Sequence, residues 1–187
     1  MVIALVVALV IAGVVGVLLL FVVGIYNGLV RKRGRVDNSW SQIDVQLQRR
    51  YDLIPNLVET VKGYAKHESG TLEAVIAARA AGINAQNVQE QAQAENILTG
   101  ALKSMFAVSE AYPELKANQN FIELQEELTA TEDKIGYSRQ FYNDSVLAFN
   151  NALQAFPANL IAGPFGFASR QYFEADATSR AAVKVQF

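Results

Sequence analysis

Few residues of this chain have the type and spacing needed for metal, acid–base or nucleophilic chemistry. His67 is the single histidine, and no His-x-x-His, Glu-x-x-His or cysteine pair accompanies it as a ligand set. A cation at the end of a helix is stabilised by the helix dipole, which is sufficient to explain this histidine. The sequence contains no cysteine, which excludes disulfides, thiol catalysis and thiolate metal sites. We expect no metal site and no cofactor.

A group of acidic residues near position 130 is the other candidate for catalysis. Its members are Glu126, Glu127, Glu132 and Asp133, followed by Lys134 and Arg139. On a helix they lie mostly off the apolar face, as is typical of a solvated charged surface, whereas paired acid–base work needs carboxylates in an apolar cleft. Gly163 and Gly166 lack the lysine and the strand-to-helix context of a phosphate-binding loop. These patterns do not predict an enzyme.

The first 25 residues have the composition of a membrane span. All 16 basic and 18 acidic residues follow Ile25, and Val2–Ile25 also contains no Asn or Gln. About 20 apolar residues are enough to cross a bilayer. A cleaved secretory signal would have a basic start and a shorter apolar run. We expect residues 1–30 to form a retained transmembrane anchor.

Basic residues follow the apolar stretch closely and predict its orientation. They are Arg31, Lys32, Arg33 and Arg35, whereas only Met1 precedes the stretch. Loops rich in Lys and Arg stay on the cytoplasmic side, so we expect an outside N-terminus and a cytoplasmic C-terminal domain. The same residues could contact anionic lipid, or could act as a topology signal alone. Since the chain is net acidic beyond Lys66, we expect no nucleic-acid partner.

Small residues recur every fourth position within the apolar stretch. They are Ala4, Ala8, Ala12 and Gly16, with Gly24 and Gly28 at the same spacing further on. Such a stripe allows two helix backbones to approach closely in lipid. It predicts self-association through this face, although alanine is common in membrane helices.

Three further long helices are expected after the basic residues. From Val36, apolar residues recur with a period of 3.5 as far as Tyr64, across Pro55, which predicts one kinked helix over residues 36–66. Arg50 interrupts this seam; it either fixes register or oligomer state, or extends to the bundle edge. A second helix is expected from Leu72 to about Phe106, and the polar segment Ala85–Asn96 either continues it as a solvated helix, which we favour, or forms a loop.

The third helix is predicted to begin at a capping box formed by Asn120 and Glu123 and to end before Pro157. Short turns would make the three helices an elongated antiparallel bundle, with the remaining tail starting at the end far from the membrane. This irregular tail contains Phe165, Phe167, Tyr172 and Phe173. It is too apolar to remain solvated, so it either packs over the bundle or forms a docking surface for another subunit.

Several segments resemble the bacterial LemA family. The longest are YNGLVRKRGRVDNSWSQIDVQLQRRYDLIPNLVETVKGYAKHE, AENILTGALKSMFAVSEAYPELKAN and NFIELQEELTATEDKIGYSRQFYND, with AARAAGINA and FGF followed by YFE. The resemblance implies one N-terminal membrane helix in the bacterial inner membrane, a cytoplasmic helical domain over residues 31–187, and no established enzymatic activity. A magnetosome membrane protein of the same family suggests a role in membrane organisation.

Two hypotheses of function follow. The first is a membrane-anchored scaffold that forms a homo-oligomer, because confinement to a surface raises effective concentration. The alternative is an accessory subunit for another membrane protein, such as a protease or transporter, which would bind through the aromatic tail.

Overall fold

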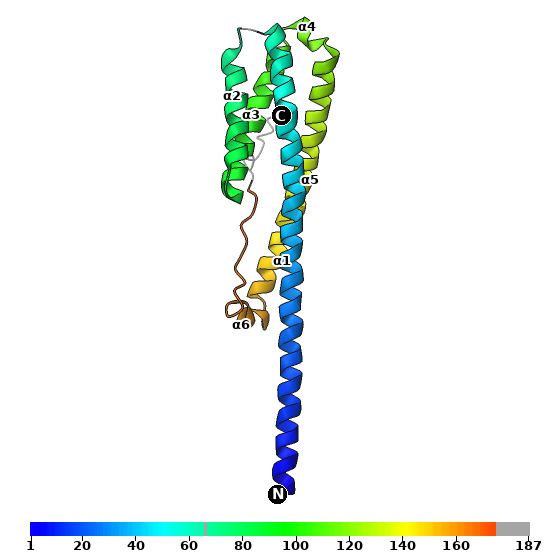
Figure 1. Ribbon diagram of the computed structural model, residues 1–187, viewed down its shortest axis with the longest axis vertical. Helices are drawn as coiled ribbons and strands as arrows, with labels where there is room; N and C mark the ends of the chain where they lie inside the picture. Colours follow the sequence, from blue (N-terminus) through cyan, green and yellow to red (C-terminus); the bar gives the residue numbers. More distant parts are fainter. Residues whose placement is uncertain (66, 175–187) are drawn as a thin grey trace, which may run out of the picture. The chain divides into compact units, whose positions relative to one another are not determined.

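The computed structural model describes residues 1–65 and 67–174, and all regular secondary structure in this part of the chain is helical (Figure 1). The helices are α1 (Val2–Tyr64), α2 (Ser69–Asn84), α3 (Val88–Ser109), α4 (Pro113–Lys116), α5 (Gln119–Gln154) and α6 (Ala158–Ala162). The predicted all-α class is confirmed. The predicted helix end at residue 66 and the last part of the predicted tail, residues 175–187, lie outside the described residues.

Helix α1 is one uninterrupted helix of 63 residues. It contains both the apolar stretch and the helix expected over residues 36–66. It also continues through Pro55 to Tyr64, because a proline removes only one backbone donor and its neighbours keep the helical path. By length and composition its N-terminal part could cross a membrane, and none of its most apolar 18-residue window is buried.

The chain forms two compact units, and both contain part of α1 and part of α5. The first unit comprises residues 1–39 and 144–170. The second comprises residues 40–143 together with residues 171–174 of the tail.

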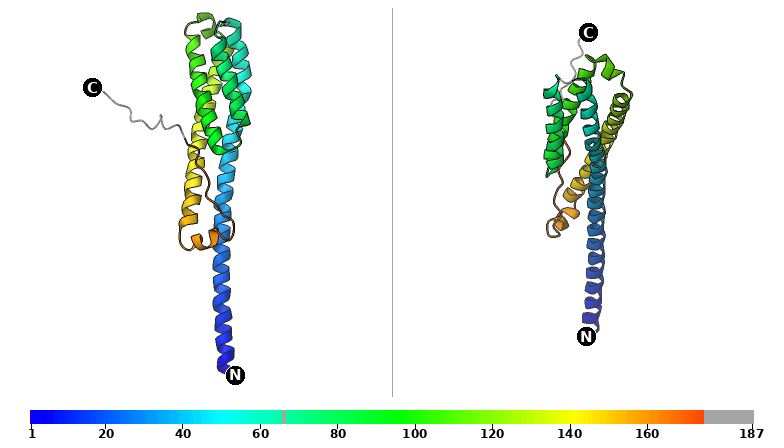
Figure 2. Two further views of the ribbon diagram at one scale, coloured as in Figure 1. Left: turned by 90° about the vertical axis from the view of Figure 1, so that its left-hand side faces the viewer. Right: turned by 45° about the horizontal axis from the view of Figure 1, so that its top comes forward.

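The second unit is a bundle in which parts of α1 and α5 lie beside α2 and α3 (Figures 1 and 2). Its fully buried apolar side chains follow the 3.5-residue period predicted for the first and third helices. On α1 they are Ile43, Leu47, Ile54, Leu57 and Val61, and on α5 Phe121, Leu128, Ile135 and Tyr142. Because burying such a side chain contributes about 1.5–3 kcal/mol, these seams are the main source of cohesion in the bundle.

The segment expected to form one second helix forms two helices instead. Helix α2 ends at Asn84, Ala85 has an extended backbone, and α3 begins after Asn87. The Asn87 side chain accepts a hydrogen bond from the Glu90 amide, and the Glu90 carboxylate accepts one from the Gln86 amide. This reciprocal capping fixes a new helix start, so α2 and α3 form an antiparallel pair (Figure 2).

A similar shift affects the start of the third predicted helix. The Asn118 side chain, rather than Asn120, accepts the hydrogen bond from the backbone amide three residues later, which belongs to Phe121. Helix α5 therefore begins at Gln119. Glu123 accepts a hydrogen bond from the Gln119 side chain instead of completing the box predicted with Asn120. Both asparagines have the right chemistry, and the earlier one leaves Phe121 inside the helix, where its ring is buried.

The tail was expected to start at the end of the bundle far from the membrane, and this prediction is wrong. In the first unit the rings of Phe165 and Phe167 lie 5.3 and 5.6 Å from the ring of Tyr26, which directly follows the apolar stretch. The additional reversal between α2 and α3 is the cause, because it makes α5 run back toward the start of the chain. Gly166 has φ = 71°, a left-handed conformation that suits glycine, where the chain turns into the tail.

Two asparagines of α5 hold the extended tail by its backbone. In the first unit Asn150 donates to the carbonyl of Arg170 and accepts from its amide, both at 2.9 Å. In the second unit Asn143 makes the same pair of bonds with Phe173, at 3.0 and 2.9 Å. We call these four residues the asparagine ladder.

We predict that Asn143→Ala releases the tail around Phe173. The substitution removes a donor and an acceptor that serve one backbone unit, at a cost of about 1–2 kcal/mol. In the full-length protein in mild detergent, hydrogen exchange at the Phe173 amide should accelerate roughly tenfold. The exposed Asn151, changed to Ala on the same helix, is the control. Equal exchange in the two variants would show that the ladder does not fix the tail.

Candidate functional site

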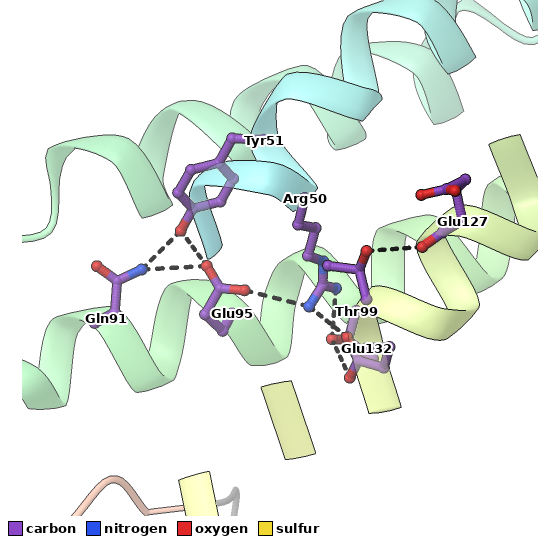
Figure 3. A network of polar contacts seen from close by, with 8 residues as sticks. Arg50, Tyr51, Gln91, Glu95, Thr99, Glu127 and Glu132 are labelled. Carbon is purple, nitrogen blue, oxygen red and sulfur yellow. Dashed lines mark hydrogen bonds and ion pairs between the residues drawn. The ribbon is translucent and has the colours of Figure 1, made fainter. Parts of the chain in front are cut away.

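The most unusual feature of the second unit is a buried arginine. Arg50 is 1 % exposed, on the apolar seam of α1. Its Nη1 atom lies 3.2 Å from Glu95 Oε2 on α3 and 2.5 Å from Glu132 Oε2 on α5, and its Nη2 donates to Thr99 Oγ1 at 2.7 Å (Figure 3). The guanidinium therefore connects three helices. The alternative in which Arg50 extends to the bundle edge is wrong.

Glu95 is fully buried and has a partner for each of its oxygens (Figure 3). One oxygen faces Arg50, and the other accepts hydrogen bonds from the Tyr51 hydroxyl and from Gln91 Nε2. Gln91 also donates to the Tyr51 hydroxyl at 2.7 Å. A buried carboxylate is costly unless it is paired and hydrogen-bonded, and here both conditions are met.

These contacts define the polar cluster, which consists of Arg50, Tyr51, Gln91, Glu95, Thr99 and Glu132. Four of its members, Tyr51, Gln91, Glu95 and Thr99, were not singled out from the sequence. Gln91 and Glu95 fall in the segment for which we favoured a solvated helix, and both are buried. Glu132 was assigned to a solvated charged surface, but its side chain is only 40 % exposed and is paired with Arg50. The available signal was Arg50 itself, since a buried cation requires a buried anion on a neighbouring helix.

Burial of Tyr51 raises the pKa of its hydroxyl, and the hydrogen bond and negative charge of Glu95 raise it further. Tyr51 also explains a glycine on α2. A Cβ added to Gly82 would collide with the Tyr51 hydroxyl and ring. Since this ring is buried and cannot move aside, only glycine fits at position 82.

A second arginine lies near the polar cluster. Burial lowers the pKa of Arg139, and the charges of Glu132 and Glu95 oppose this shift. Its guanidinium carbon lies 4.6 Å from the centre of the Phe173 ring, a cation–π contact that joins α5 to the tail. The charges of Glu132 and Glu95 thus act on both Arg139 and Arg50.

Two surface grooves border this region. One, of about 200 Å³, has walls whose exposed surface is mostly apolar. It is lined by Arg50, Thr99, Leu102, Lys103, Phe106, Leu128, Thr129, Glu132 and Asp133. The other, of about 380 Å³, is lined by Asn56, Thr60, Asn120, Glu123, Leu124 and Glu127. The first is smaller than most ligand pockets, and the second is walled mainly by exposed polar residues.

The residues predicted to meet the membrane surface lie in the first unit. Arg31, Lys32 and Arg35 are exposed on α1. Arg33 is partly buried, and its guanidinium carbon lies 5.1 Å from the centre of the Phe167 ring. The predicted association stripe, Ala4, Ala8, Ala12 and Gly16, lies on the uncovered part of α1.

The four aromatic residues proposed for docking separate into two kinds. Phe167 and Phe173 are buried against their own units, whereas Phe165 and Tyr172 remain 53 % and 36 % exposed. Phe167 packs on Phe149 and Tyr26, and Phe173 packs on Trp40. The tail is therefore partly used within the chain itself, as one of the two sequence alternatives expected.

What this arrangement does chemically is to hold helices together. The buried Glu95 carboxylate accepts hydrogen bonds from an arginine, a tyrosine and an amide, and the partly exposed Glu132 pairs with Arg50 at the wall of the smaller groove. Within residues 1–65 and 67–174, no group of three or more His, Cys, Asp and Glu side chains could hold a metal ion.

We predict that Arg50→Met destabilises the bundle by about 3–5 kcal/mol, because Glu95 would be left buried without its cation. The control is Arg49→Met, which removes the exposed ion pair with Glu127 and should cost about 1 kcal/mol or less. Thermal unfolding can be followed through Trp40, the single tryptophan, which packs on Tyr142 and Phe173. Replacing Arg50 and Glu95 together by Met should recover much of the loss. Equal stabilities for the two single variants would contradict the assignment.

We also predict a pH effect that belongs to Tyr51. Because its pKa is raised in the folded state, the folded protein retains a proton that the unfolded chain loses above the ordinary value of 10.0. The stability advantage of the wild type over Tyr51→Phe should therefore be constant below pH 10.0 and should decline above it. Chemical unfolding followed by circular dichroism at several pH values measures this difference. An advantage that grows with pH would have the wrong sign.

Known proteins share sequence with this chain over most of its length. The LemA family profile matches residues 39–187. Protein LemA of Metamycoplasma hominis is 26 % identical over 171 residues, which cover 89 % of this chain and 76 % of that protein. Magnetosome proteins MamQ 1 and MamQ 2 of Paramagnetospirillum magneticum are each 24 % identical over 175 residues; the match covers 80 % of this chain and less than two thirds, 64 %, of each relative. Since the profile covers most of the sequence, the chain belongs to the LemA family.

Proposed function

We propose that this LemA-family protein is a non-enzymatic, single-pass membrane protein that self-associates and acts as a scaffold at the membrane surface. The observation that carries the proposal is the apolar part of α1, whose most apolar window is not buried by any of the residues that the structure describes. About 20 apolar side chains exposed to water would be strongly unfavourable, whereas a bilayer solvates them. Lipid is therefore the first partner of the chain.

The orientation proposed is an outside N-terminus with the C-terminal domain in the cytoplasm of a bacterial inner membrane. The exposed residues Arg31, Lys32 and Arg35 support it, because they directly follow the apolar stretch and such basic residues stay on the cytoplasmic side. Names of the magnetosome relatives support a membrane-associated role, although the chain spans only part of their length.

A role without catalysis is supported by the use of charge in the bundle. The buried Glu95 and the partly exposed Glu132 both pair with Arg50, so the polar cluster positions helices, and its members that line the smaller groove are already bonded to one another. Self-association is supported by the stripe of Ala4, Ala8, Ala12 and Gly16, which lies on the uncovered part of α1. Confinement of many copies to one surface would then give avidity without large individual contacts.

The experiment is the native mass of the full-length protein in mild detergent. We expect an oligomer, and we expect Ala8→Leu with Ala12→Leu to shift it toward monomer, because the larger side chains separate the helix backbones. The matched control is Val10→Leu with Val14→Leu, since these exposed valines lie about half a turn away on the same helix and should not change the mass.

A monomeric wild type would contradict the scaffold and would favour the accessory subunit that binds another membrane protein, a protease or transporter, through the tail. An oligomer that is unaffected by the alanine substitutions would instead remove the stripe as its cause.

A further inference from the structure

The segment around α6 is unusually apolar for an exposed part of a protein surface. Residues 145–169 contain no charged residue. Within it, Phe156, Leu160 and Phe165 are 79 %, 65 % and 53 % exposed. We call the part from Phe156 to Gly166, which includes α6, the α6 turn. Large exposed apolar side chains that gather in one segment mark a surface that binds a partner or a membrane.

The inner side of the α6 turn is fixed by the first unit. Ile161 and Ala162 are buried, and the amides of Phe165 and Phe167 donate to the carbonyls of these two residues at 3.2 and 2.9 Å. Phe167 then packs on Phe149 of α5. The turn therefore has a buried side, with Ile161 and Ala162, and an exposed side, to which Leu160 and the exposed half of the Phe165 ring belong.

Contacts to Tyr26 place this turn beside the end of the apolar stretch. The ring of Phe165 lies 5.3 Å from the ring of Tyr26, one residue after Ile25. Figure 2 shows the α6 segment alongside α1 in this unit. Aromatic residues at the end of a membrane helix typically lie at the level of the lipid headgroups. Phe165 must then lie at about the same level.

We propose that the α6 turn inserts Phe156, Leu160 and Phe165 into the headgroup and upper acyl region of the bilayer that contains the apolar stretch. The proposal rests on the membrane anchoring proposed above and adds a second, separate membrane contact. Lipid is favoured as the partner of the exposed side chains because Phe165 contacts Tyr26, and Tyr26 directly follows the part of α1 that we assign to lipid. The absence of charge over residues 145–169 removes the main cost of entering the interface.

Basic residues of α1 lie where such an insertion would need them. Arg33 stacks on Phe167, which closes the α6 turn, and the exposed Arg31 and Lys32 are its neighbours. About 10 Å of helix separates Tyr26 from Arg33, a distance comparable with the thickness of the headgroup layer. Aromatic insertion with a basic flank is the usual pattern of an interfacial segment on anionic lipid.

The test uses the absence of cysteine in this chain. Single cysteines replace Leu160 or Phe156 in the full-length protein, each is labelled with a nitroxide, and the protein is reconstituted in vesicles of phosphatidylcholine and phosphatidylglycerol. Collision rates with oxygen, which concentrates in lipid, and with a water-soluble nickel chelate then report depth. Leu147→Cys is the matched control, because Leu147 is an exposed leucine of the same unit and the same uncharged segment. Phe21→Cys reports the apolar stretch.

We expect the labels at positions 160, 156 and 21 to show a several-fold higher ratio of oxygen to nickel collisions than the label at 147. If position 160 behaves like position 147 while position 21 remains in lipid, the insertion is overturned and the anchoring stands. If position 21 is also open to the nickel chelate, both proposals fail together. A label at position 160 that is shielded from both reagents would mean that a protein surface, such as a second copy, covers the turn, and would overturn the lipid assignment.

Discussion

An apolar helix surface that the described residues leave uncovered is the constraint on which the rest of this structure depends. The first part of α1 presents its side chains in every direction, so neither a bundle seam nor a single neighbouring helix is sufficient to bury it. Helix α1 continues without interruption to Tyr64. Its surface is therefore apolar on all sides in the first part and apolar along only one narrow seam in the second part. The change begins at Tyr26 and Leu29, where the Phe165 and Phe167 rings and the end of α5 first provide protein contacts.

Inside the bundle the group that needs a partner is a buried charge, that of Arg50, rather than an apolar surface. Arg50 lies where the seam would otherwise contain an aliphatic residue, and its carboxylate partners come from α3 and α5. A paired buried charge contributes little net stability compared with apolar packing, but it penalises any arrangement in which the pair is separated. We therefore interpret the polar cluster as a device that fixes the register of α1, α3 and α5. Tyr51 and Gly82 fix the position of α2 in the same way, because the tyrosine ring fits only against a residue without a side chain.

Periodicity in the sequence was sufficient to predict the all-helical class, the seams of α1 and α5, and the apolar stretch. It was insufficient where local capping decided the outcome. Asn87 and Glu90 have capping-box spacing, yet the surrounding Ala, Gln and Glu favour helix, so the reversal into α3 was missed. This single error also displaced the tail to the wrong end. Of the polar cluster, the sequence indicated only that Arg50 interrupts an apolar seam. Its carboxylate partners are 45 and 82 residues away, and no local sequence pattern distinguishes a buried glutamate from an exposed one.

We infer that the apolar stretch lies in lipid and that α1 leaves the bilayer near Tyr26 without interruption. This inference is tested by the reaction of single cysteines, placed at successive positions from 4 to 40 of the full-length protein in native membranes, with a water-soluble maleimide. We expect no reaction through Ile25 and a sharp onset of reaction by Lys32, on exposed positions of the helix. Reaction throughout the apolar stretch, at the rate seen beyond Lys32, would contradict it.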